Sequence, residues 1–340
     1  MIIDKYRKFR YWLKLNINFI INLINLIFIK ISLFLKNRPI VIINLHEHLG
    51  DIVACEPIAR YIKKRSPNAF IIWLVHRHYR ELLEYNPYID LILEMHCLSE
   101  GILLSKISIY DELIDLHFSD RFCGLCIYPI KKSDKTRVNL KNFYDHGSIL
   151  DAMTFAVGIP KLNIAPNIYI PAKVIVKVEK LSLPKDFIVV HTKSSNIAKD
   201  WSQEKWIFLI KKLANKGINI IEVGIDQTIA CEAGVISLSG KLSILETAEV
   251  ISRATLFLGI DSGPAHLANA LSKEAILLMG EFAGWPDYNP FGPPFRKSNL
   301  CTIIRSTKVE DIHIEDVEKK VLGRYFQIIG QNKNETISIN

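Results

Sequence analysis

The chain has 340 residues, of which 49% are hydrophobic and 23% charged; this length and composition favour two folded domains and exclude disordered and fibrous classes. Lysine and arginine exceed aspartate and glutamate by eight, so we expect an anionic partner: nucleic acid, a phosphorylated ligand or an acidic membrane surface. Six cysteines are too few for a disulfide framework and are typical of a reduced, cytosolic protein.

Residues 1–37 are expected to form a hydrophobic amphipathic helix. A cleavable signal peptide is disfavoured, because no small-residue cleavage site follows the apolar stretch. A membrane span is also disfavoured, because Leu15–Ile29, the longest stretch between lysines, is shorter than the roughly 20 residues that a span needs and contains four asparagines.

The polar residues of this segment fall near one another on a helical wheel. They are Lys14, Asn18, Asn22, Asn25, Ser32 and Lys36. The rest of the circumference is apolar, and basic residues stand at both ends. Two interpretations fit: residues 1–36 lie on an anionic membrane surface, or they dock on the protein's own core or on a second subunit. The basic ends favour the membrane, and with it a peripheral position on the cytoplasmic face of the inner membrane.

From residue 38 to 170, short apolar runs alternate with amphipathic stretches, which predicts a parallel sheet with helices on both faces. The expected strands are Ile40–Leu45, Phe70–Val75, Ile89–Met95 and Leu113–His117. Tyr79–Tyr85 reads as an amphipathic stretch, and Asn142–Val157 is expected to be the helix that closes this first domain. Four prolines between Pro160 and Pro184 then indicate a linker.

The same alternation resumes in residues 185–325. The expected strands are Phe187–Thr192, Ile218–Val223, Val235–Leu238, Thr255–Ile260 and Ala275–Met279, and the expected helices are Gln203–Lys216, Ile244–Ala254 and Pro264–Leu271. Ser243 and Glu246 form a capping-box pattern at the start of one helix. The sequence therefore predicts two doubly wound α/β domains, with ligands at the carboxyl ends of the strands.

The first such loop, from His46 to Asp51, contains a glycine followed by an acid where a helix begins. Asp51 is a candidate general base, or it satisfies the N–H groups at the helix terminus. His46 and His48 lack a third ligand at a recognisable spacing, so we expect no metal site. A single Cys-x-x-Cys pattern, Cys123 and Cys126, fits either a redox pair or two buried thiols, and the second interpretation is favoured.

The clearest local motif is Gly259–Ala270, in which a strand runs into a Gly-Pro turn and a helix of small residues. Pro264 suits the first helical position and is expected to leave N–H groups free around Ala265 and His266, where a diphosphate would bind. Asp261 and His266 could instead cap the helix and pack in the core.

The segment His191–Ser195, with Lys199, Asp200 and Trp201 after it, places hydroxyls and lysines at another strand end. The Gly-rich motifs of dinucleotide oxidoreductases and of P-loop enzymes are absent, as is any Asp-x-Asp pair that would hold a metal-bound nucleotide sugar.

Three of these motifs together resemble glycosyltransferase family 9, the ADP-heptose:lipopolysaccharide heptosyltransferases and their relatives. They are Gly50-Asp51, Lys199-Asp200-Trp201 and Asp261-Ser262-Gly263-Pro264-Ala265-His266-Leu267-Ala268. The resemblance extends from about Ile40 to Pro294. It implies a GT-B architecture of two Rossmann-like domains, an N-terminal acceptor domain and a C-terminal nucleotide-sugar domain, and inverting, metal-independent transfer of a sugar to a glycan such as the lipopolysaccharide core.

The resemblance also implies roles for single residues. Asp51 matches the family's base, and the positions that match its donor site are Ser194, Ser195, Lys199, Leu242, Asp261, Ser262, Gly263 and His266. His46, Glu47 and His48 occupy the acceptor side, where many members carry Lys or Arg, so this chain departs from the pattern there. ADP-heptose is the family's usual donor, and no cofactor besides the donor is expected. The alternatives are another nucleotide sugar on a different glycan or a protein, or a non-catalytic nucleotide-sugar binder. We expect no nucleic-acid partner, because the lysines are dispersed.

Overall fold

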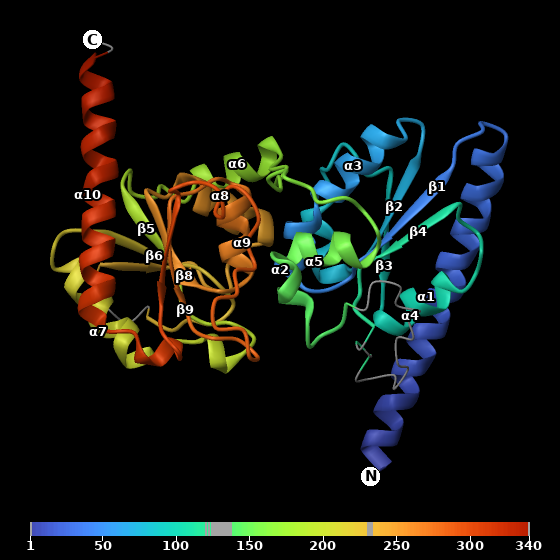
Figure 1. The fold of residues 1–340 in the computed structure, drawn as a ribbon, viewed down its shortest axis with the longest axis horizontal. Coiled ribbons are helices and arrows are strands. Elements are labelled where there is room, and N and C mark those ends of the chain that lie inside the picture. Colours follow the sequence, from blue (N-terminus) through green and yellow to red (C-terminus); the bar gives the residue numbers. More distant parts are fainter. Residues whose placement is uncertain (1, 120, 122, 124–137, 230–233, 339–340) are drawn as a thin grey trace. The chain divides into compact units, whose positions relative to one another are not determined.

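The computed structural model describes residues 2–119, 121, 123, 138–229 and 234–338. The chain divides into two units, Met1–Ile164 and Ala165–Asn340. Each unit is built around one parallel β-sheet with helices packed against it (Figure 1). The α/β fold with two parallel sheets that the sequence predicts is therefore confirmed.

The sheet of unit 1 has four parallel strands in the order β3-β2-β1-β4. The strands are β1 Ile40–Asn44, β2 Phe70–His76, β3 Leu91–Met95 and β4 Glu112–Asp115. Around them lie the helices α1 Ile2–Phe34, α2 Leu49–Cys55, α3 Pro57–Arg65, α4 Leu98–Ser105 and α5 Ile149–Ala156, and the 3-10 helices η1 Arg77–Leu82 and η2 Phe143–His146. All five residues of β1 are buried, as expected of an apolar strand that is covered on both faces of a parallel sheet.

Two predicted elements of unit 1 differ in the structure. The expected helix Asn142–Val157 is divided into η2 and α5, because Gly147 adopts a φ of 112° between them. Ser148 then begins α5 with a capping box closed by Asp151. In the stretch Tyr79–Tyr85, the residues up to Leu82 belong to η1, a single 3-10 segment, and the last three form a turn.

The helix α1 differs from its expectation in two respects. It is continuous over 33 residues, and Tyr6–Phe34 is long and apolar enough to cross a membrane by length and composition, so the argument that the stretch is too short was wrong. The sequence alone assigned no partner to the polar side of the wheel. In the structure Asn18 and Asn22 face unit 1, where Glu100 and the carbonyl of Glu94 accept hydrogen bonds from their side chains.

The sheet of unit 2 has six parallel strands in the order β10-β9-β8-β5-β6-β7. They are β5 Phe187–His191, β6 Asn219–Glu222, β7 Val235–Ser237, β8 Leu256–Ile260, β9 Ala275–Met279 and β10 Cys301–Arg305. The remaining elements are α6 Ala172–Glu179, η3 Ile197–Lys199, α7 Gln203–Ala214, α8 Ile244–Arg253, α9 Gly263–Ala270, η4 Val309–Asp311 and α10 Ile314–Ser338. The strand order reverses between β5 and β8, which is the doubly wound arrangement.

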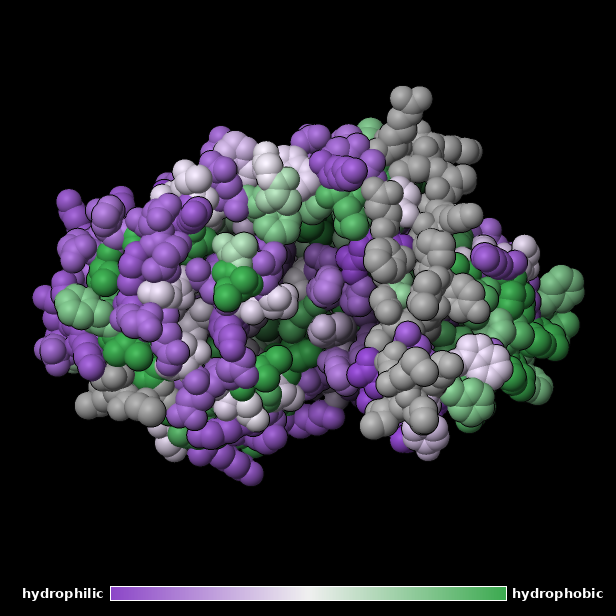
Figure 2. Space-filling model, turned by 90° about the horizontal axis from the view of Figure 1, so that it is seen from below, coloured by the Kyte–Doolittle hydropathy of each residue, from purple (hydrophilic) through white to green (hydrophobic). Residues whose placement is uncertain are grey.

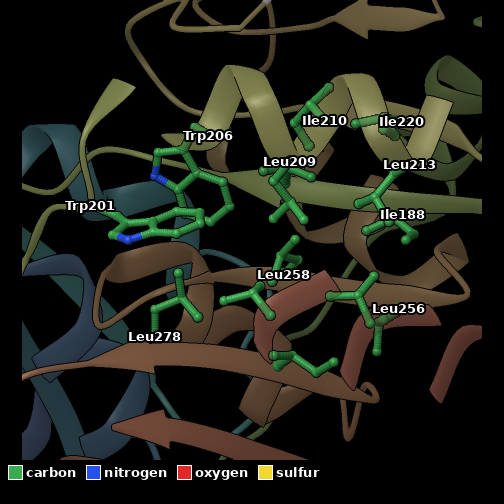
Figure 3. Packing of buried hydrophobic residues seen from close by; sticks show 14 of the residues in the cluster. Ile188, Trp201, Trp206, Leu209, Ile210, Leu213, Ile220, Leu256, Leu258 and Leu278 are labelled. Atoms are coloured by element: carbon green, nitrogen blue, oxygen red, sulfur yellow. The ribbon is translucent and has the colours of Figure 1, made fainter. Parts of the chain in front are cut away.

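One face of this sheet is covered by α7 and α10. Trp206, Leu209 and Leu213 of α7 pack onto strand residues such as Ile188 and Leu258 (Figure 3). From α10, Val317, Val321 and Tyr325 join the same buried cluster. Burial of this cluster fixes α7 against the sheet.

The capping box predicted for unit 2 is confirmed. The elements α6, β10 and α10 were not predicted. The capping box of Ser243 and Glu246 is present at the start of α8. The proline-rich stretch contains α6, and β10 and α10 extend the fold at the C-terminal end, with α10 continuing to Ser338. The apolar residues of α10 that reach the core recur every four positions, a spacing that the sequence does contain.

Candidate active site

Both units place polar loops where the strand order reverses. In unit 2, β5 and β8 are neighbours, and His191 pairs in register with Gly259. In unit 1, β1 and β4 are neighbours, and Asn44 pairs with Asp115. Since loops after parallel strands diverge at such a point, each unit offers a natural crevice there for a ligand.

In unit 2 the side chain of Asp261 holds Lys199. The Nζ of Lys199 lies 2.6 Å from Oδ2 of Asp261, and the hydroxyl of Tyr288 donates to the same oxygen at 2.9 Å. The ammonium of Lys199 also lies 4.4 Å from the ring centroid of Phe282, a cation–π distance. Asp261 therefore positions a half-buried cation at the end of β8, and Ser262, not Asp261, is the N-cap residue of α9.

Ser262 turns its side chain toward β5. Its Oγ lies 3.0 Å from Nδ1 of His191 and donates to the carbonyl of Ile260 at 3.2 Å, so the hydroxyl makes no capping hydrogen bond to α9. Burial lowers the pKa of His191 to about 4, so its ring is neutral at pH 7. Gly224 approaches this ring so closely that a Cβ there would lie 3.0 Å from Cδ2 of His191.

Fewer backbone N–H groups are free at the start of α9 than the sequence predicted. The N–H groups of Ala265 and His266 were expected to be free, but both donate to the carbonyl of Ser262, at 3.1 and 3.3 Å, which corrects that prediction. Within the described part of the chain, the N–H of half-buried Gly263 makes no hydrogen bond. With the helix dipole, it leaves this terminus able to meet an anion.

His266 packs into the protein behind this terminus. Its ring lies 4.6 Å from that of Phe291, and its Nδ1 has no hydrogen-bond partner among the described residues. Burial lowers the pKa of His266 to about 4, although the charge of Asp261 acts to raise it; the charge of Lys199 lowers it further. The residue is therefore neutral at pH 7 and supports α9 by packing.

The other predicted donor residues lie in the loops at the same sheet edge. The Oγ of Ser194 accepts from the N–H of Asn196 and donates to its carbonyl, and Ser195 is exposed. Leu242 is half-buried in the loop after β7, in which the N–H of Gly240 donates to the carbonyl of Gly224 at 2.8 Å. These loops follow β5, β6 and β7, which are adjacent strands.

In unit 1, Asp51 lies half-buried in the first turn of α2. The helix N-cap is His48, whose side chain makes no capping bond. Burial, and then the charges of Glu47 and Asp51, raise the pKa of the Tyr79 hydroxyl in η1. Both carboxylates belong to the segment that follows β1, Glu47 in the loop and Asp51 in α2.

A buried chain of side chains links β1 to β4 beneath this loop. Nδ1 of His46 lies 2.9 Å from Nε2 of His117, and Nδ1 of His117 lies 2.8 Å from Oδ1 of Asp115. Burial, and then the charges of His117 and Arg121, lower the pKa of His46 to about 2, so His46 is neutral. Arg121 pairs with Glu47 and lies 3.3 Å from Nε2 of His48, so the three predicted acceptor residues are each held by neighbours.

Sequence reasoning missed several of these neighbours. Tyr288 and Phe282 belong to a stretch without regular periodicity, and no local signal marks them as contacts of Lys199. His117 was included only as the end of a strand, although a histidine after an apolar run was a usable signal. Arg121 lies beside residues that the structure does not describe. Cys126 is one of those residues, so the Cys123–Cys126 pattern lies outside the described residues.

Among the residues that the structure describes, no group of three or more histidine, cysteine, aspartate or glutamate side chains could hold a metal ion.

Comparison with protein families decides the affiliation of the chain. The model of glycosyltransferase family 9 (heptosyltransferase) matches residues 152–321, which is half of the sequence. The chain belongs to this family. The matched residues include the Lys199–Asp261 pair and the start of α9. The resemblance inferred from the sequence motifs is therefore confirmed.

Two curated relatives of this family-9 chain are similar over a short region. Lipopolysaccharide heptosyltransferase 3 of Escherichia coli is 30% identical over 107 residues, covering 28% of this chain and 32% of that protein. The protein of that name from strain K12 is 28% identical over 115 residues, covering 31% and 33%. The chain thus spans about a third of the length of the curated relatives it matches.

Solved structures show the same fold over most of the family-9 chain. Glycosyltransferase family 9 from Veillonella parvula DSM 2008 has a TM-score of 0.66 at 17% identity, covering 85% of this chain and 97% of that one. The ADP-heptose lipopolysaccharide heptosyltransferase II of E. coli has a TM-score of 0.63 at 18% identity, covering 85% and 99%. E. coli heptosyltransferase WaaC with ADP-2-deoxy-2-fluoro heptose has a TM-score of 0.55 at 15% identity, covering 84% and 99%. The fold is therefore GT-B-like.

Proposed function

We propose that this chain is an inverting, metal-independent glycosyltransferase that moves a heptose from an ADP-linked donor to a hydroxyl of a cell-surface glycan such as the lipopolysaccharide core. Membership of family 9 supports the transfer reaction. The names of the curated relatives, and the ADP-heptose analogue in the WaaC structure, support the donor and the class of acceptor.

The observation that carries the proposal is the cation site at the end of β8. A half-buried Lys199 is held by Asp261 and Tyr288 beside the N-terminus of α9, where Gly263 offers an N–H. A nucleoside diphosphate gains negative charge as it leaves the anomeric carbon. Lys199, the Ser262 hydroxyl and the dipole of α9 stabilise that charge, so the residues that bind the donor also promote its departure.

The hydroxyl of the glycan acceptor must lose its proton when it attacks the donor sugar, and the Asp51 carboxylate takes that proton. As the acceptor oxygen forms its bond to the anomeric carbon, the bond from that carbon to the diphosphate oxygen breaks. The hydroxyl proton passes to the Asp51 carboxylate, and the electron pair of the broken bond leaves with the nucleoside diphosphate. Attack on the face opposite to the leaving group inverts the configuration of the anomeric carbon.

The loop that precedes Asp51 is assigned to acceptor recognition. Glu47 is half-buried and paired with Arg121, and His48 is exposed beside the same guanidinium. His46 is held by His117 from below. This polar, rigid loop takes the place of the lysine or arginine that many family members carry, so the acceptor differs from theirs in the groups it presents near the reacting hydroxyl.

A panel of nucleotide sugars tests the donor. A ligand that binds only the folded state at about 100 times its Kd adds about 2.7 kcal/mol to the free energy of unfolding, which raises the Tm by about 5–10 °C for a unit of this size. We expect ADP-heptose to give this shift, and UDP-, GDP- and CMP-sugars to give a smaller one.

Product analysis by mass spectrometry then tests the reaction. Transfer of heptose to a truncated lipopolysaccharide core in the presence of EDTA is the expected result. Stabilisation by another nucleotide sugar that is also turned over identifies the same scaffold with a different donor. Binding without turnover of any donor–acceptor pair identifies a non-catalytic binder and overturns the proposal.

A further inference from the structure

The helix α1 is bound to unit 1 along one face. Leu15, Leu26 and Leu33 are each at most 5% exposed, and Leu26 and Leu33 belong to the buried cluster that includes Ile40 and Ile72 of the sheet. These leucines recur along a single stripe of the helix, which packs on the start of α4 at Leu15 and on the sheet at Leu26 and Leu33.

Polar contacts fix the rotation of α1 about its own axis. The Nδ2 atoms of Asn18 and Asn22 donate to the carboxylate of Glu100, at 2.8 and 2.7 Å, and to the carbonyl of Glu94, at 2.9 and 3.0 Å. Glu100 is fully buried, and its carboxylate also accepts from the N–H of His96 at 2.6 Å. Turning α1 would leave this buried carboxylate without two of its donors, which is costly.

The opposite face of α1 is apolar and exposed. Thirteen large hydrophobic side chains between residues 6 and 35 are at least 41% exposed; they are Tyr6, Phe9, Trp12, Leu13, Ile17, Ile20, Ile21, Ile24, Ile27, Phe28, Ile31, Phe34 and Leu35. Figure 2 shows hydrophobic residues gathered at the right of the view, the side on which Figure 1 draws α1. Single exposed leucines are ordinary, but a continuous apolar face of this length marks an interaction surface.

Charge identifies what covers this face. The only acidic residue among the first 46 is Asp4, whereas the exposed basic residues of this segment include Arg7, Arg10, Lys14 and Lys36. At 100° per residue, Arg7, Arg10 and Lys14 fall along one flank of the apolar face and the exposed Lys8 along the other, while Lys36 follows the end of α1. An apolar face bordered by basic residues and lacking acidic ones complements an anionic lipid membrane, in which apolar acyl chains lie beneath negatively charged headgroups.

We propose that the exposed face of α1 lies in the interfacial layer of an anionic lipid membrane, with the helix axis parallel to the membrane plane. The apolar side chains enter the boundary between headgroups and acyl chains, and the basic flank meets the anionic headgroups. A spanning arrangement would detach Asn18 and Asn22 from Glu100 and uncover the apolar sheet beneath. The inference is independent of the proposed transfer reaction, since it concerns residues outside both candidate site loops.

Vesicle binding of the full chain, without nucleotide or acceptor, tests the proposal. We expect co-flotation with vesicles of phosphatidylcholine and phosphatidylglycerol, weaker binding to phosphatidylcholine alone, and weakening by salt. Replacing exposed residues of α1 in the variant Ile24→Ser/Phe28→Ser/Ile31→Ser should reduce binding by about tenfold or more, because apolar burial is lost. The matched control is Val176→Ser/Phe208→Ser/Phe326→Ser, which removes three exposed apolar side chains of unit 2 and should bind as the native chain does.

The position of α1 in the lipid is read from Trp12. This side chain is 51% exposed, whereas Trp73, Trp201 and Trp206 are at most 2% exposed. The fifth tryptophan, Trp285, is half-buried in unit 2, so the measurement is made in a Trp285→Phe variant, in which lipids brominated near the headgroup should quench mainly Trp12. Absence of vesicle binding, together with self-association that the triple α1 variant abolishes, would assign the face to a subunit interface. Retention in the bilayer through alkaline carbonate extraction would identify a span, and either result overturns the proposal.

Discussion

Asp51 and Lys199 have different tasks in the proposed transfer: the Asp51 carboxylate accepts the proton of the attacking hydroxyl, and the Lys199 ammonium stabilises the charge of the diphosphate. Asp51 lies half-buried in the first turn of α2, and Lys199 is held by Asp261 in unit 2. We expect Asp51→Asn to leave donor binding intact and to lower the transfer rate by at least about a hundredfold, because the amide does not accept the hydroxyl proton. Steady-state kinetics and a donor titration check this.

The control for this variant is Asp51→Glu, which keeps a carboxylate at the position and should retain part of the activity. If Asp51→Asn transfers sugar at a near-native rate, Asp51 serves only the helix terminus. Glu47, the neighbouring carboxylate, is then the base to test.

We expect Lys199→Ala to weaken both nucleoside-diphosphate binding and transfer. Its ammonium meets the bound diphosphate and the additional charge on the leaving group, so a loss of about a hundredfold in kcat/KM is expected. Calorimetric titration with ADP checks binding separately from turnover. The exposed Lys216 provides a control, since Lys216→Ala removes the same charge from the surface of unit 2. Normal binding and turnover by Lys199→Ala would place the phosphate site elsewhere, with Lys193 next to test.

Buried histidines should make the native state sensitive to acid. Burial lowers the pKa values of His191 and His266 to about 4, from the ordinary value of about 6.5. Between about pH 6.5 and pH 4 the unfolded chain binds more protons at these sites, so the free energy of unfolding decreases as the pH falls through this range, by up to about 3 kcal/mol for each histidine.

Urea unfolding as a function of pH measures this effect. His266→Gln should reduce the loss of stability in that window, whereas His313→Gln, which changes an exposed histidine, should not. An unchanged pH profile in His266→Gln would show that His266 does not titrate as a buried group.

At the scale of elements, the contact between α1 and α4 depends on Asn22. Its side chain is 6% exposed and donates to Glu100 and to the carbonyl of Glu94. Asn22→Ala leaves these buried acceptors with fewer donors, and we expect it to lower the free energy of unfolding by about 1–3 kcal/mol. Asn25, one turn further along and exposed, is the matched control. Equal urea midpoints for the two variants would contradict the docked orientation of α1.

At the scale of the whole molecule, α1 is a structural part of unit 1. Removal of residues 1–36 uncovers the sheet residues that pack on Leu26 and Leu33, and it leaves Glu100 buried without its asparagine donors. We expect the truncated chain to lose at least about 5 kcal/mol of stability and to aggregate, because three buried leucines are removed together. Light scattering and thermal unfolding check this, and a soluble truncated chain with a cooperative, native-like transition would refute it.

Local patterns in the sequence predicted the parts of the fold that depend on neighbours along the chain. The strands β1 and β5 are buried apolar runs that read directly as strands, and Ser243 caps α8 through a residue three positions away. The motif from Asp261 to His266 likewise lies within one turn and one helix, and together with Gly50-Asp51 and Lys199-Asp200-Trp201 it indicated the family that the comparison then showed.

The tertiary structure decided whatever depends on residues far apart in the sequence. The pairing of β5 with β8 brings His191 to Ser262, and Lys199 reaches Asp261 across 62 positions. The inward face of α1 is set by Glu100, which lies 78 positions beyond Asn22. A helical wheel shows that asparagines share a side, but a buried carboxylate elsewhere in the chain determines whether that side meets water or protein.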